Sequence, residues 1–139
     1  ADFSFKALIN RADFDIQYQQ SDIVALAKEY ISSNYMNQIS LSSIRNQIHN
    51  NTSYLSRKFK EKAGTNITEY ITAVRIENAK KLLTYTKVPI LHISYNVGFT
   101  DQNYFSRVFK RIVSKTPQEF RKELNWIIEN TQNRDVTIQ

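Results

Sequence analysis

Apolar residues recur at steps of three and four positions along most of the chain, which is the spacing that gives an α-helix one hydrophobic face. No segment shows a sustained apolar and polar alternation bounded by hairpin turns, the pattern typical of paired strands. We therefore expect an all-α protein.

Polar capping residues, glycines and prolines divide this pattern into about seven helices. Gly64 and Gly98 follow helix ends, where glycine suits a left-handed backbone. A long helix is expected to run from Asn66 to about Tyr85. The expected starts are Ser21, Ser40, Asn51 or Thr52, Asn66, Pro89, Thr100 or Asp101, and Thr116.

Residues 1–20 have no single pattern. Their first half has helical spacing, whereas Phe14, Ile16 and Tyr18 alternate as in a strand. A chain that begins at Ala1 is compatible with a fragment, and removal of an initiator Met before Ala is the alternative. We expect a fragment, in which residues 1–20 are a connector or the end of an upstream domain.

An internal repeat lies in the middle of the chain. Residues 54–60 (YLSRKFK) recur as residues 104–110 (YFSRVFK), fifty positions later. A short apolar-faced helix precedes each copy, with Ile44 and Ile48 matching Ile93 and Val97. The repeated unit is therefore helix, tight turn, helix, and the long helix joins its two copies.

The second helix of each copy has one apolar and one polar face. A rotation of about 100° per residue puts Leu55 and Phe59 on one side and Arg57 on the other. In the second copy Phe105, Phe109 and Ile112 are expected inward and Asn103, Ser106, Arg107 and Lys110 outward, with Gln102 at the helix tip. Such a helix fits the major groove, where Arg pairs with guanine and Asn or Gln with adenine. Lys60 and Lys110 suit phosphate.

The positive charge is concentrated over the repeat. The chain has 19 Lys and Arg against 13 Asp and Glu, and residues 45–122 hold 15 of these basic and 5 of these acidic residues. A basic face on one helix is usually only solvated, but its duplication favours DNA as the partner. A helical protein-interaction module whose basic face meets an acidic partner remains the alternative.

Composition removes most enzyme classes. The absence of Cys excludes thiolate nucleophiles and thiolate zinc sites, and two His leave little for an imidazole metal centre. Two Gly cannot form a phosphate-binding loop. We expect no catalytic residues, no cofactor and no metal. No apolar run approaches the roughly 18 residues of a membrane span, so we expect a location in the cytoplasm.

About a hundred residues, from Ser21 to Arg121, resemble the DNA-binding domain of AraC/XylS-type bacterial transcription regulators. The motifs of the second half are Ile93-Ser94, Val97-Gly98-Phe99, Asp101, Tyr104 to Arg107, Phe109-Lys110, Thr116-Pro117 and Phe120-Arg121. Those of the first half and the long helix are Tyr54 to Arg57, Phe59-Lys60, Gly64, Glu69-Tyr70, Arg75, Ala79-Lys80 and Leu82-Leu83. The DNA-repair methyltransferases that share this fold need a Cys acceptor, which is absent here.

The resemblance implies two helix-turn-helix lobes, residues 21–64 and 87–122, joined by a linker helix over residues 65–86 and followed by an extension over residues 123–139. Each lobe would put its second helix into one of two successive major-groove segments of double-stranded DNA. The implied base-reading residues are Ser53, Ser56, Arg57, Gln102, Asn103, Ser106 and Arg107. The expected phosphate contacts are Arg45, Thr52, Lys60, Lys110 and Thr116.

The resemblance also implies partners, and the sequence departs from the family pattern at two positions. The stretch from Tyr30 to Leu41 resembles the response-regulator, YesN-like branch, so an upstream sensing, dimerisation or receiver domain is expected outside this chain. RNA polymerase is a further candidate partner, the implied location is the bacterial nucleoid, and no membrane is expected. Arg45 stands where the family generally has a small residue. Ser114 replaces the usual Gly, in a loop that is strained if it needs a positive φ.

Overall fold

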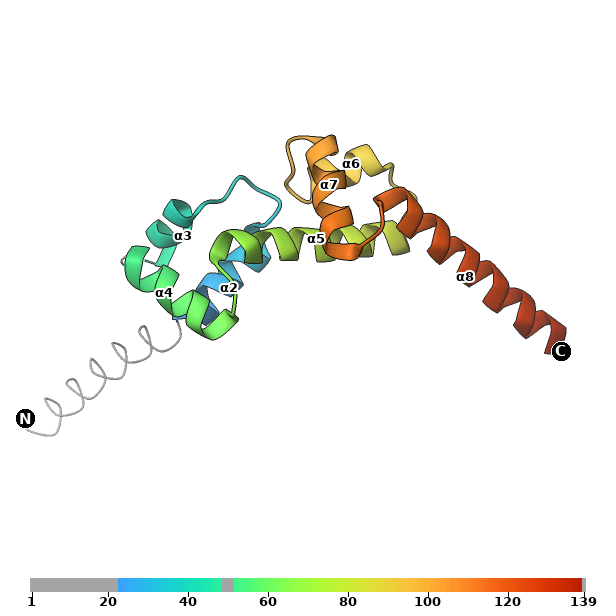
Figure 1. The fold of residues 1–139 in the computed structure, drawn as a ribbon, viewed down its shortest axis with the longest axis horizontal. Coiled ribbons are helices and arrows are strands. Elements are labelled where there is room, and N and C mark those ends of the chain that lie inside the picture. The colour runs from blue at the N-terminus through green and yellow to red at the C-terminus, as the bar shows by residue number, and fades with distance from the viewer. Residues whose placement is uncertain (1–22, 49–51, 139) are drawn as a thin grey trace, which may run out of the picture. The chain divides into compact units, whose positions relative to one another are not determined.

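The structure is a computed structural model, and it describes the backbone of residues 23–48 and 52–138. Within these residues the chain forms helices and turns without strands, which confirms the all-α expectation (Figure 1). The helices are α2 (Ile23–Asn34), α3 (Leu41–Ile48), α4 (Thr52–Ala63), α5 (Ile67–Tyr85), α6 (Ile90–Asn96), α7 (Gln102–Val113) and α8 (Pro117–Ile138). Residues 1–20 and the expected caps Ser21 and Asn51 lie outside the described residues.

The described residues form two compact units. Unit 1 consists of residues 23–34 and 39–71, apart from residues 49–51, and unit 2 consists of residues 35–38 and 72–138. Helix α5 contributes its first five residues to unit 1 and the rest to unit 2. Each unit therefore contains one pair of consecutive short helices, α3 and α4 or α6 and α7.

Unit 1 is built on α2, which packs against both α3 and α4. Its apolar side chains are almost completely buried because the three helices turn their hydrophobic faces toward one another. Phe59 of α4 meets Tyr70 of α5 edge-on, with ring centroids 5.2 Å apart. The buried residues are Ile23, Val24, Ala27, Ile31, Ile44, Leu55, Phe59, Ile67 and Ile71.

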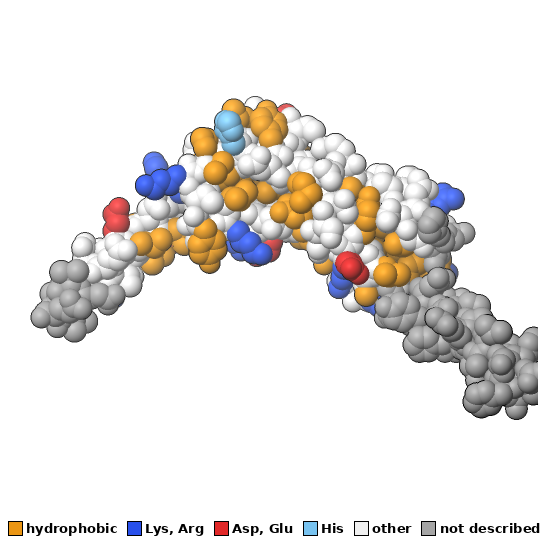
Figure 2. All heavy atoms as spheres, turned by 180° about the vertical axis from the view of Figure 1, so that it is seen from behind, with side chains coloured by type: hydrophobic (Ala, Val, Ile, Leu, Met, Phe, Trp, Pro, Cys, Tyr) orange, Lys and Arg blue, Asp and Glu red, His pale blue; other side chains and the backbone are white. Residues whose placement is uncertain are grey.

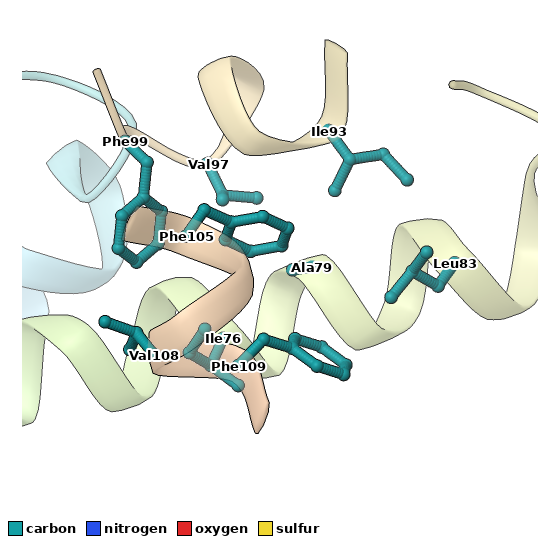
Figure 3. Close-up of a cluster of buried hydrophobic side chains, with 9 residues drawn as sticks. All are labelled: Ile76, Ala79, Leu83, Ile93, Val97, Phe99, Phe105, Val108 and Phe109. Carbon is teal, nitrogen blue, oxygen red and sulfur yellow. The ribbon is translucent and has the colours of Figure 1, made fainter. Parts of the chain in front are cut away.

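Unit 2 has one core cluster, to which α5, α6, the turn after α6 and α7 all contribute (Figure 3). In the close-up, Ile76, Ala79 and Leu83 of α5 face the side chains of the other elements. The centroid of the Phe105 ring lies 5.1 Å from that of Phe99 and 5.8 Å from that of Phe109. The cluster consists of Ile76, Ala79, Leu83, Ile93, Val97, Phe99, Phe105, Val108 and Phe109.

Three of the expected helix starts are capped by side chains. Ser40 and Ser43 exchange hydrogen bonds at the start of α3, and the Asn66 side chain accepts from the Glu69 amide at 2.8 Å. Thr116 and Glu119 form a reciprocal capping box at the start of α8. These bonds satisfy amides that the first turn of a helix leaves without partners.

At the helix ends, the expectation for Pro89 was wrong, whereas the positive φ considered for Ser114 is observed. Pro89 was expected at the first position of a helix, but it is the N-cap of α6, because its ψ of 146° is extended and helical geometry begins at Ile90. Ser114 has a φ of 70°, so the loop before α8 has the positive φ that was the stated condition for strain at this position. Gly64 and Gly98 adopt positive φ of 78° and 106° after α4 and α6.

Helix α8 is 22 residues long and has apolar side chains on its surface. Trp126, Ile127 and Ile128 are all exposed, and Figure 2 shows hydrophobic side chains gathered along this helix. In the part of the chain that the structure describes, no helix has the length and apolarity that a membrane crossing requires.

Candidate nucleic-acid interface

In unit 1 the candidate residues lie mainly on α4. Its inward face is anchored by Leu55 and Phe59, both fully buried. Successive residues differ by about 100°, so the same helix turns Ser53, Arg57 and Lys60 toward solvent. Ser56 is half-buried at the edge of this face.

Arg57 is supported by its own helix. Its guanidinium carbon lies 5.7 Å from the centroid of the Tyr54 ring, one turn earlier. Lys58, next to Arg57, forms an ion pair with Glu61 at 3.4 Å, so that lysine is partly neutralised. Sequence analysis did not identify Tyr54 as a support for Arg57, although a spacing of three residues in a helix is the signal for such a pair.

The other predicted residues of unit 1 are Arg45 and Thr52. Arg45 is exposed in the last turn of α3. Thr52 is the first residue of α4, and its side chain lies outside the described part of the structure. Their predicted phosphate contacts stay predictions.

In unit 2 the turn between α6 and α7 sets the start of the candidate helix. Asp101 is the N-cap of α7, and its side chain accepts hydrogen bonds from the amides of Asn103 at 2.8 Å and Tyr104 at 3.3 Å. This cap stabilises the first turn. Asp101 is therefore the N-cap of α7, one of the two residues at which this helix was expected to start.

The polar face of α7 carries the predicted residues in succession. Asn103, Arg107 and Lys110 are exposed, whereas Gln102 and Ser106 are half-buried. Each of the three exposed residues follows the previous one by three or four positions, so their side chains follow one side of the helix. A row of this kind offers amide, guanidinium and ammonium donors to a groove.

One inward assignment on α7 was wrong. Ile112 is 46% exposed, whereas Val108 is 3% exposed and belongs to the core cluster. Rotation does place Ile112 on the side of Phe105, but burial also requires a neighbouring element. In the last turn of α7 it is Val113 that packs against the cluster.

Thr116 is engaged within its own capping box. Its hydroxyl oxygen accepts from the Glu119 amide at 3.1 Å, and its amide donates to the Glu119 carboxylate at 3.2 Å. The hydroxyl proton is not used in these two bonds. A phosphate contact by Thr116 stays a prediction.

The predicted DNA-contacting cations of α4 and α7 take part in no ion pair among the described residues. The ion pairs among the described residues are Lys58–Glu61, Lys80–Glu77 and Lys115–Glu123. None of them involves Arg57, Lys60, Arg107 or Lys110. Their charges are therefore available to a polyanion. Within the same described residues, no group of three or more His, Cys, Asp or Glu side chains is arranged to hold a metal ion.

Arg75 on α5 is a residue whose contacts sequence analysis did not predict. Its guanidinium donates to the carbonyl oxygens of Tyr35 at 2.8 Å and Asn37 at 2.9 Å. Burial lowers the pKa of Arg75 from its ordinary value. The partners are about forty residues away in sequence, so no local periodicity signals these contacts.

Comparison with known proteins places this arrangement in a family. A family model described as a helix-turn-helix domain matches residues 45–123. An uncharacterised HTH-type transcriptional regulator from the cgkA 5′ region of Pseudoalteromonas carrageenovora is 37% identical over 100 residues, which are 72% of this chain and 59% of that protein. The chain spans between 14% and 59% of the length of the first curated relatives that it matches.

Two solved structures have the same fold over most of the chain. The C-terminal domain of AraT, a response regulator from Geobacillus stearothermophilus, has a TM-score of 0.71 and 32% identity, covering 73% of this chain and 84% of that one. The C-terminal domain of the two-component response regulator yesN from Fusobacterium nucleatum has a TM-score of 0.66 and 34% identity, covering 70% and 95%. The chain belongs to the AraC-type helix-turn-helix family of DNA-binding domains of transcription regulators.

Proposed function

We propose that this chain is the sequence-specific double-stranded-DNA-binding part of a bacterial transcription regulator, with a DNA-binding rather than a catalytic role. Helices α4 and α7 each enter one of two successive major-groove segments. The observation that carries the proposal is the equivalence of the two helices. Phe59 and Phe109 are both fully buried, whereas Arg57 and Arg107 are both exposed at the corresponding outward positions.

The outward residues have the chemistry that base recognition needs. An arginine guanidinium donates two parallel hydrogen bonds to the O6 and N7 atoms of guanine, and Asn103 or Gln102 can pair with adenine. In unit 1, Ser53 and Ser56 add hydroxyl groups that bond either a donor or an acceptor. The bases are thus read by Arg57 with two serines in one groove and by Gln102, Asn103, Ser106 and Arg107 in the next.

Lysines, Arg45 and two threonines position the protein on the sugar-phosphate backbone of the DNA. Lys60 and Lys110 each lie about one helical turn after Arg57 and Arg107. From there a flexible ammonium group reaches phosphate oxygens of the DNA. Arg45 and Thr52 add contacts around the first groove. Thr116 donates its hydroxyl proton to a phosphate while its oxygen keeps the cap of α8.

The DNA-binding chain is part of a longer regulator. Support comes from the share of the curated relatives that it spans, which is 59% at most among the first of them. AraT and yesN, whose C-terminal domains are similar to this chain, are both described as response regulators. We therefore propose an upstream sensing, dimerisation or receiver domain, a location in the bacterial cytoplasm, and RNA polymerase as a further partner.

The test is selection of bound fragments from a random double-stranded DNA library at near-physiological salt. Wild-type protein should enrich an asymmetric motif of two short blocks about one helical turn apart. The Arg57→Ala/Arg107→Ala variant should lose the motif. The Lys81→Ala/Arg134→Ala variant is the control, because it also removes two exposed cations but leaves α4 and α7 intact.

Two results would contradict the proposal. Wild-type protein that enriches no motif would favour a protein-interaction module with a basic face. Equal loss in the control variant would mean that total charge, and not the two recognition helices, determines binding.

A further inference from the structure

The turn that precedes α7 is backed by Arg75 of α5. A Cβ atom placed at Gly98 would lie 2.8 Å from the Arg75 Nε atom, so the guanidinium packs directly against this turn. The Arg75 guanidinium carbon also lies 5.9 Å from the centroid of the Phe99 ring. One side chain thus contacts two consecutive residues of the turn.

The same guanidinium holds the segment of residues 35–38. It donates to the carbonyl oxygens of Tyr35 at 2.8 Å and Asn37 at 2.9 Å. From that segment, the Gln38 side-chain amide donates to the Gly98 carbonyl oxygen at 3.1 Å. Residues 35–38, the guanidinium and the Gly98–Phe99 turn therefore form one hydrogen-bonded and packed cluster within unit 2, which we call the Arg75 cluster.

The Arg75 cluster depends on arginine geometry. A planar guanidinium presents donors in fixed directions, so it bonds two carbonyl oxygens while its central carbon stays over the Phe99 ring. The ion pairs among the described residues do not involve Arg75, so carbonyl oxygens and the Phe99 ring hold its charge. A lysine ammonium keeps the charge but lacks the planar fork.

The Arg75 cluster is joined to α7 through Phe99. The Phe99 ring centroid lies 5.1 Å from that of Phe105 and 6.0 Å from that of Tyr104, both in the first turns of α7. Two residues after Phe99, Asp101 caps the helix and binds the Asn103 amide. A shift of Phe99 is therefore passed to the end of α7 that carries Gln102 and Asn103.

We propose that Arg75 is a positioning residue for base recognition by α7, acting through the Gly98–Phe99 turn. This inference rests on the proposed function. It extends the specificity determinants from the exposed face of α7 to a half-buried side chain on α5. Displacement by about 1 Å is enough to weaken groups that must meet a base edge in a fixed geometry.

The experiment compares wild-type protein with Arg75→Lys and Arg75→Met. Lys81→Met is the control on the same helix, because Lys81 is exposed. Dissociation constants are measured on the selected duplex and on duplexes with the first or the second block scrambled, well below the unfolding temperature of every variant. Backbone hydrogen exchange is measured in parallel without DNA.

The block that α7 contacts is identified as the one whose scrambling no longer matters to Arg107→Ala. For this block, the ratio of the dissociation constants on the scrambled and selected duplexes should be at least about fivefold smaller in Arg75→Met than in wild type. Arg75→Lys should fall between Arg75→Met and wild type. Discrimination at the other block and the salt dependence should not change. The Phe99 and Asn103 amides should exchange at least about fivefold faster in Arg75→Met, while the Ile44 and Gly64 amides of unit 1 keep their rates.

Three results would overturn the inference. One is unchanged discrimination at the α7 block, and another is equal loss at both blocks, which would indicate a general structural role. The third is an unchanged exchange rate at Phe99 and Asn103. Wild-type protein that discriminates on none of the duplexes would instead contradict the proposed function itself, and the exchange rates would show separately whether Arg75 holds the turn.

Discussion

A Cβ atom at Gly98 would lie 2.5 Å from the carbonyl oxygen of Tyr35, closer than real Cβ contacts come. Gly98 has a φ of 106°, which side chains rarely adopt, so both the backbone conformation and the neighbouring carbonyl require glycine here. Both the positive φ and the Tyr35 carbonyl therefore exclude a side chain at this position in the turn before α7.

Gly98→Ala should lower the free energy of unfolding by about 3 kcal/mol or more, because a positive φ and a backbone clash both penalise the methyl group. Gly64→Ala is the matched comparison. Gly64 also has a positive φ, but no atom lies within 4 Å of its added Cβ, so the loss should be about 1 kcal/mol. Denaturant titration of both variants measures the difference. Equal losses would show that the contact with Tyr35 has no energetic consequence.

Ser114→Gly should raise the free energy of unfolding by roughly 0.5 to 1 kcal/mol. Ser114 has a φ of 70°, and glycine removes the steric cost of this conformation while adding backbone entropy to the unfolded chain. The expected rise in the thermal midpoint is roughly 2 to 4 °C. Ser32→Gly is the control with the opposite sign, because Ser32 is an exposed residue in regular helix α2. A lower midpoint for Ser114→Gly would mean that the serine side chain itself stabilises the loop.

Arg107→Ala should weaken binding to the preferred DNA site by about 1 to 3 kcal/mol and relax the preference at one base pair. The reason is that an exposed guanidinium on α7 offers two parallel donors to a guanine. Binding to each of the four base pairs at that position should be measured by competition. Equal loss on all sequences would contradict a base-reading role for Arg107.

Lys110→Ala should weaken binding to any DNA, because an ammonium that contacts phosphate carries no base information. The slope of log K against log salt should become less steep by about one unit. Arg134→Ala is the charge-matched control, since Arg134 is exposed on α8 beyond the residues that the family model matches. An unchanged slope in Lys110→Ala would remove Lys110 from the phosphate contacts.

For the candidate interface, the sequence predicted which side chains are buried and which are exposed wherever their direction around the helix alone determines it. The burial of Phe105 and Phe109 and the exposure of Arg107 and Lys110 follow from positions along one helix. Ile112 shows the limit, because rotation gives the direction of a side chain but not the presence of a neighbour. Its 46% exposure depends on where the other elements of unit 2 end.

The sequence by itself determined the described helices and the caps at Asn66, Asp101 and Thr116, because each depends on residues within a few positions. The repeat can be seen in the sequence directly. The amide that Asp101 binds and the reciprocal bonds of Thr116 and Glu119 span two or three residues, and such contacts form wherever the local spacing is right. Only the tertiary structure decided which residues hold the turn before α7. Arg75 reaches Tyr35 across forty residues of sequence, and its partners are backbone carbonyls, which every residue possesses. Contacts of that kind leave no residue pattern, so packing alone brings them together.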